Sequence, residues 1–134
     1  MGGGRRGGRG PFGGTGGAAG RAARLAVDVV GFSPEDLVCA MNVLAVARGI
    51  GEHNGCAKAF IEELPLLKER CPGVKTSGGI STLSFSFRGN DRVREAMHSA
   101  FLYHAIRARL DLRIVNAWHL VLYEDIEPAL LELV

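Results

Sequence analysis

The chain has 134 residues, of which 47% are hydrophobic, as expected for one ordinary globular domain. The net charge is only +2, and acidic and basic residues are interspersed after residue 27, so no continuous basic surface for a nucleic acid is expected. No run of about 18 apolar residues occurs, and the N-terminus lacks the apolar core of a secretory signal. We therefore expect a soluble, cytoplasmic protein without membrane or nucleic-acid partners.

The potential metal ligands show no binding pattern. The cysteines Cys39, Cys56 and Cys71 are odd in number and widely spaced, which fits neither a disulfide framework nor a zinc site. The four histidines have no HExxH spacing, so packing or exposure is the default for them. We expect no metal, and cysteines that stay reduced.

Residues 1–24 consist mainly of glycine, arginine and alanine, with no acidic residue before Asp28. Such a segment buries too little apolar surface to offset its ordering entropy, so a disordered leader is predicted before a folded domain at residues 25–134. An RGG-type RNA-binding tail is disfavoured by the lack of aromatics other than Phe12, and a transit peptide by the absence of serine before Ser33. A low-complexity extension without a selected role is the preferred interpretation.

The first half of the domain predicts a strand followed by a helix. Residues 37–45 form a short apolar run, typical of a strand buried on both faces of a parallel sheet. Residues 52–70 have helical apolar spacing that ends before Pro72 and Gly73, and Pro65 should kink or split this helix.

The second half repeats this order. Residues 74–87 predict a strand, a glycine turn and a second extended piece, and Asn90 can cap a helix whose arginines, Arg94 among them, face solvent. Residues 110–123 predict a further strand and its loop, and residues 126–134 a short helix. Repeated units of this kind imply an α/β fold with a parallel sheet. Three to four units cannot close a (β/α)8 barrel of about 250 residues, so a barrel would be partial, with open sheet edges.

One segment is specific enough to indicate a family. Residues 77–90 read SGGISTLSFSFRGN, which resembles the SGG(V/L)SNxSFSFRGN signature of the pterin-binding domain of cobalamin-dependent methionine synthase. Residues 42–47 and 51–54 are similar to that family's DPNxLxVATGxEEHN stretch, and the similarity extends through residues 114–117 and 123–126. The resemblance covers roughly residues 30 to 134.

This resemblance implies a pterin-binding (β/α)8 barrel that binds 5-methyltetrahydrofolate at the C-terminal ends of its strands. In the family the N5-methyl group passes to cob(I)alamin, and a hydrogen-bond donor at N5 assists because the nitrogen of an unprotonated tertiary amine would leave as an anion, a poor leaving group. The cobalamin-binding domain of the parent enzyme would be a partner. The chain has no D-x-H-x-x-G phrase, so it is not expected to hold cobalamin itself.

The resemblance also assigns site residues. The family's N5-donor asparagine corresponds to Thr82, and its pterin-binding aspartate corresponds to Ala40. Family glycines appear as Arg109, Arg113 and Trp118, where close backbone approach or positive φ is expected. The matching substrate-binding positions that remain are Asn42, Gly78, Gly79, Ser81, Ser84, Phe87, Arg88 and Asn116.

The two substitutions at Ala40 and Thr82 lead to three hypotheses for function. Losing two polar contacts, roughly 1.5–3 kcal/mol for one involving a charge and less for a neutral one, would weaken folate binding by about two to three decades. The chain would thus be a methionine synthase fragment, inactive alone, or a degenerate, non-catalytic derivative of that domain. A dihydropteroate synthase-like enzyme fits the SFSFRGN phrase less well. A dimer or a partner half-barrel would complete the sheet. The alternative role for Asn42 and Asn116 is structural, as hydrogen-bond partners of neighbouring loops.

Overall fold

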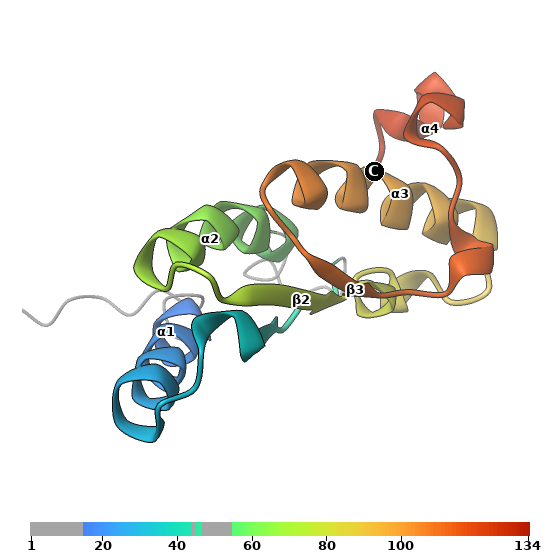
Figure 1. The fold of residues 1–134 in the computed structure, drawn as a ribbon. Helices are drawn as coiled ribbons and strands as arrows, with labels where there is room; N and C mark the ends of the chain where they lie inside the picture. The colour runs from blue at the N-terminus through green and yellow to red at the C-terminus, as the bar shows by residue number, and fades with distance from the viewer. Residues whose placement is uncertain (1–14, 44, 47–54) are drawn as a thin grey trace, which may run out of the picture.

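The computed structural model describes residues 15–43, 45–46 and 55–134. Its centre is a sheet of three parallel strands in the order β1 (Val38–Met41), β2 (Lys75–Gly79) and β3 (Leu112–Ile114) (Figure 1). Helix α2 (Cys56–Arg70) lies between β1 and β2 in the chain, and α3 (Asp91–Arg107) between β2 and β3. This confirms the predicted α/β class with its parallel sheet.

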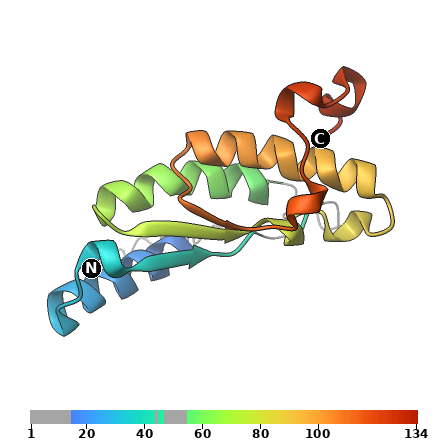
Figure 2. The same ribbon diagram turned by 45° about the vertical axis from the view of Figure 1, so that its right-hand side comes forward.

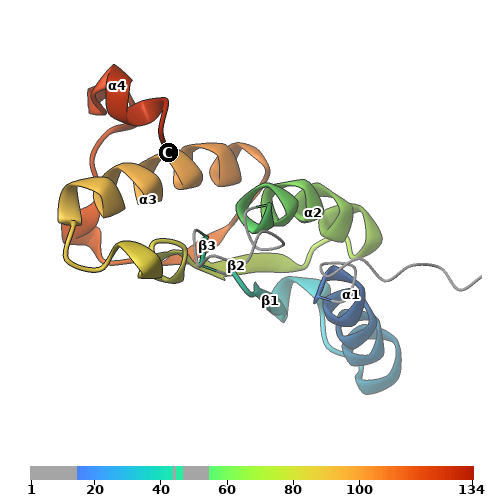
Figure 3. The same ribbon diagram turned by 180° about the vertical axis from the view of Figure 1, so that it is seen from behind.

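The two crossover helices cover the same face of the sheet (Figure 2). Helix α1 (Thr15–Leu25) lies beyond β1, beside the C-terminal end of α2 (Figure 3), where the Cys71 thiol donates to the Gly20 carbonyl at 3.7 Å. The short α4 (Pro128–Leu131) packs on α3. The prediction of a disordered leader is wrong for residues 15–24, because they lie in helix α1. Residues 1–14 of the predicted leader lie outside the described part of the chain.

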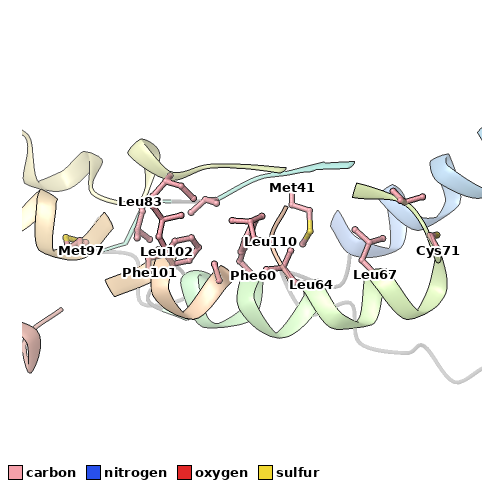
Figure 4. Close-up of a cluster of buried hydrophobic side chains, with 14 of the residues drawn as sticks. Met41, Phe60, Leu64, Leu67, Cys71, Leu83, Met97, Phe101, Leu102 and Leu110 are labelled. Carbon is pink, nitrogen blue, oxygen red and sulfur yellow. The ribbon is translucent and has the colours of Figure 1, made fainter. Parts of the chain in front are cut away.

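The core lies between the sheet and helices α2 and α3 (Figure 4). Leu64 of α2 and Ile80 are completely buried, and the rings of Phe60 and Phe101 meet with centroids 5.5 Å apart. A Cβ atom at Gly78 would lie 2.9 Å from the Phe60 ring. Glycine at this position thus lets β2 approach α2 more closely than any other residue would.

The prediction that the first strand is buried on both faces is wrong. Met41 is buried towards the helices, but Val38 is 49% exposed and Ala40 is also exposed. The register pairs Ala40 with Ser77, and Ser77 with Leu112, so these residues share the sheet face that points away from the helices. Within the described residues no helix covers that face, which is why Val38, Ala40 and Leu112 are exposed on it, although Ser77 of the central strand is buried.

The second extended piece expected before residue 87 is also absent. The chain instead forms two 3-10 turns, η4 (Ile80–Thr82) and η5 (Phe85–Phe87). The Ser86 hydroxyl donates to the Val46 carbonyl at 2.9 Å, and the Ser84 hydroxyl is bonded inside the core. These two bonds hold the turns to the chain after β1 and to α3.

The helix boundaries follow their sequence signals. Asn90 caps α3 as predicted, with its side-chain oxygen accepting from the Val93 amide at 3.4 Å. Helix α2 ends at Arg70, just before the Cys71-Pro72-Gly73 sequence that was expected to stop it. It continues through Pro65 as one helix rather than two, while residues 52–54 of the predicted helix lie outside the described residues.

A polar cluster joins the amino ends of β2 and β3. The Asp111 carboxylate accepts from the Thr76 amide at 2.7 Å and the Thr76 hydroxyl at 3.1 Å, and from the Lys68 ammonium of α2. Burial raises the pKa of Asp111, but the hydrogen bonds from Lys68 and Thr76 outweigh it and leave the pKa below its ordinary value. The cluster therefore fastens α2 and the starts of β2 and β3 to each other.

Arg109 carries backbone strain that glycine would relieve. Its φ is 75°, and it is the only residue other than glycine with positive φ in the described residues. The left-handed conformation costs a side-chain-bearing residue about 1–2 kcal/mol, and the greater chain entropy of glycine offsets about 0.5–1 kcal/mol of this. We expect Arg109→Gly to raise the free energy of unfolding by about 0.5–1 kcal/mol, measured by urea titration.

The matched control is Arg107→Gly, in the last turn of α3. Glycine at an ordinary helical position should lower stability by about 1 kcal/mol. Loss of stability in both variants would show that φ at Arg109 is not strained.

Candidate functional site

Three polar side chains follow the three strands. Asn42 follows β1, Thr82 ends the η4 turn after β2, and Asn116 lies two residues beyond β3. Because the strands are parallel and adjacent, their carboxyl ends meet at one edge of the sheet, near the amino-terminal end of α3 (Figure 1). Ligands of open α/β sheets bind at this edge.

The side chains at this edge are accessible. Asn42, Thr82 and Asn116 are exposed, and Ser81 and Gly79 are half-buried. The Asn116 side-chain oxygen accepts from the Trp118 amide at 3.1 Å, which fixes the orientation of the side-chain amide. The arrangement thus offers amide and hydroxyl groups that can donate and accept hydrogen bonds with a flat heterocycle.

Two of the predicted site residues instead face the core. Gly78 points at the Phe60 ring, and Ser84 is 0% exposed. The Ser84 oxygen lies 2.6 Å from Nε2 of His98 and accepts from Nε of Arg94 at 3.0 Å. The structure accounts for both residues by packing and internal hydrogen bonds.

The last two predicted residues lie in or after the η5 turn. Phe87 packs against the hydrophobic core. Arg88 is exposed, with its guanidinium carbon 3.9 Å from the centroid of the Phe85 ring. Arg88 is therefore held by a cation–π contact on the surface and supplies a positive charge there.

Sequence reasoning missed His98 and misplaced Arg94. Arg94 was expected on the solvent side of its helix, but it is half-buried and bonded to Ser84. His98, one turn further along, is completely buried; burial first, and then the Arg94 charge, lower its pKa below the ordinary value. The four-residue spacing of Arg94 and His98 was the available signal in the sequence that the two side chains lie on the same side of α3.

A hollow of about 940 Å³ lies elsewhere, between α2, α3 and the C-terminal segment. Its walls are mostly apolar, with Phe101, Leu131 and Tyr123 among them, and of the predicted site residues only Phe87 lines it. Its position on the helix side of the sheet separates it from the polar edge. It is not the site that the loop residues form.

The described residues contain no group of three or more His, Cys, Asp or Glu side chains able to hold a metal ion. In the same part of the chain, no helix has the length and apolar character needed to cross a membrane.

A family model described as "Pterin binding enzyme" matches residues 17–116. The match includes most of α1, helices α2 and α3, all three strands and the polar side chains at their carboxyl ends. The chain therefore belongs to the pterin-binding enzyme family.

Proposed function

We propose that the loops after β1, β2 and β3 bind the pterin ring of 5-methyltetrahydrofolate. The observation that carries this proposal is the exposure of Asn42, Thr82 and Asn116 at one edge of the sheet, each after a different strand. Side-chain amides both donate and accept, which matches the alternating N–H and carbonyl groups of a pterin. The family match supports a pterin or folate ligand.

The finer identity rests on the SFSFRGN phrase. We infer that the chain corresponds to the second half of the pterin-binding barrel of a cobalamin-dependent methionine synthase. In that setting the Thr82 hydroxyl donates to N5 of the folate and so stabilises the nitrogen as the methyl group leaves. Cobalamin accepts the methyl group in such enzymes, and in this proposal it belongs to another domain.

The sheet itself supports a partial barrel. Val38 and Leu112 are exposed on the face away from the helices, and Ile114 on the same face is 74% exposed. In a closed barrel this face is the packed interior, and the free edges of β1 and β3 pair with further strands. We infer that another half-barrel, from a second copy or a partner, covers this face in the functional protein.

Catalysis by the chain alone is not part of this proposal. The methyl group of Ala40 stands where the resembled family places a carboxylate, and Thr82 reaches less far than asparagine. Binding is therefore weak, and methyl transfer depends on the complete assembly.

Isothermal titration of the purified chain with 5-methyltetrahydrofolate tests the proposal, using Asn116→Asp as the variant. Aspartate keeps the oxygen that accepts from Trp118 but removes the amide donors. We expect weak binding to the original chain and a further loss of about 5- to 10-fold in the variant, the typical effect of one hydrogen bond.

Asn90→Asp is the matched control, because Asn90 also caps a helix through its oxygen but is not one of the proposed pterin contacts. Its affinity should be unchanged. Equal losses in the two variants, or no binding by a chain that melts cooperatively, would contradict the proposed site.

A further inference from the structure

Helix α3 makes side-chain hydrogen bonds to the loops after both β2 and β3. His98 meets Ser84, between the turns η4 and η5, with Nε2 and Oγ 2.6 Å apart. The next residue, Ser99, uses its hydroxyl to accept from the Val121 amide at 3.0 Å. Two consecutive residues of one helix thus hold two loops that carry the proposed pterin contacts.

The donors and acceptors around Ser84 determine where the hydrogen atoms of its hydrogen bonds lie. The Arg94 guanidinium can only donate, so the Ser84 oxygen accepts from it and its own hydrogen is left to donate to Nε2 of His98. His98 is then neutral, with its proton on Nδ1, and the His119 backbone acts on His98 as a hydrogen-bond acceptor. A charged His98 would leave the Ser84 hydrogen without this acceptor and would place two cations side by side.

The charged and titratable groups around His98 agree with this arrangement. Arg94 approaches from the preceding turn of α3, and His119 from the η6 turn (Ala117–His119) after β3. No carboxylate acts on His98 among these groups, and burial lowers the pKa of His98. The neutral form is therefore the stable one near neutral pH.

The Ser84 anchor acts directly on the loop that contains Thr82. The Leu83 carbonyl accepts from the Val46 amide at 3.1 Å, and the Ser84 carbonyl accepts from the Phe87 amide at 2.9 Å. The segment after Thr82 is thus attached both to the chain beyond β1 and to α3. Displacement of the Ser84 backbone would therefore shift Thr82, two residues earlier in the chain.

We propose that His98 and Ser99 are positioning residues, which hold the loops after β2 and β3 so that Thr82 and Asn116 face the same ligand. This inference rests on the proposed function for its ligand, but the anchoring of the loops can be measured without one. His98 touches no ligand in this scheme and acts only through Ser84.

The test compares His98→Gln with His98→Leu by amide hydrogen exchange and by 5-methyltetrahydrofolate titration. The glutamine carbonyl can still accept from Ser84, whereas leucine leaves that hydroxyl buried without an acceptor. We expect about tenfold faster exchange of the Phe87 amide and about tenfold weaker binding in His98→Leu, and near-original values in His98→Gln. Side-chain nitrogen NMR of the original chain should show the His98 proton on Nδ1.

The control is His104→Leu, the same change at an exposed position of the same helix, which should leave the Phe87 amide unaffected. Ser84→Ala removes the same anchor and replaces His98→Leu if that variant does not fold. Ser99→Ala should accelerate exchange at Val121 while sparing Phe87, because its hydrogen bond serves the other loop.

The outcomes separate the two proposals. Equal exchange in the leucine and glutamine variants, or acceleration that extends equally to the Cys71 amide at the end of α2, would overturn the positioning role. The expected exchange pattern in a chain that binds no folate would retain the positioning role and refute the proposed function.

Discussion

Ala40→Asp combined with Thr82→Asn is expected to strengthen 5-methyltetrahydrofolate binding by about two to three decades. The two changes restore the acceptor and the donor that the resembled family has at these positions. A hydrogen bond to a charged group contributes roughly 1.5–3 kcal/mol and a neutral one about 1 kcal/mol, and 1.4 kcal/mol corresponds to a tenfold change in affinity. Isothermal titration measures the gain.

The structure favours this gain without a large cost in stability. Ala40 is exposed on the face away from the helices, so a carboxylate there remains hydrated. Thr82 is also exposed, at the end of a 3-10 turn where asparagine is well tolerated. The melting temperature should therefore change little in the double variant.

Val38→Asp is the matched control for charge. Val38 lies two residues earlier on the same strand and the same face, and is 49% exposed. A carboxylate there has the same net charge but the wrong position, so it should not improve binding. An equal gain from Val38→Asp would mean that general electrostatics, rather than a pterin contact, accounts for the effect.

Leu64→Ala is expected to have the largest effect on stability, lowering the free energy of unfolding by about 3 kcal/mol. Leu64 is 0% exposed and packs on the sheet side of α2 (Figure 4). Removing a buried leucine costs the transfer free energy of the lost atoms and leaves a cavity, together about 2–5 kcal/mol. Denaturant unfolding followed by circular dichroism measures the change.

Leu66→Ala provides the comparison, since it makes the same substitution on the same helix at a position that is 48% exposed. Leu66→Ala should lower the free energy of unfolding by less than about 1 kcal/mol, because truncating a half-exposed side chain leaves no cavity in the core. Similar losses at the two positions would contradict the packing of α2 on the sheet.

The sequence predicts the order of elements better than their burial. Apolar periodicity and caps correctly indicated α2, α3 and the parallel strands, because these signals are local. Burial of β1 was overestimated because an apolar run shows only that a strand can be buried on both faces. Whether it is buried depends on which elements pack against it. The same limit explains the exposed Ile114.

The candidate site was predicted in part. The positions of Asn42, Thr82 and Asn116 follow from the rule that parallel strands end at one edge. The inward direction of Ser84 does not, because its partners come from α3, ten and fourteen residues further along the chain. Pairings between a turn and a later helix leave no periodic signal in either segment.

The Asp111 cluster has a consequence for folding kinetics. Its partners Thr76 and Lys68 precede it by 35 and 43 residues, so the contacts form only after the chain has passed through the whole of α3. Contacts between residues so far apart in the chain raise the contact order, and folds of higher contact order form more slowly. We therefore expect the amino ends of β2 and β3 to join late in folding, after α2 and α3 have begun to form.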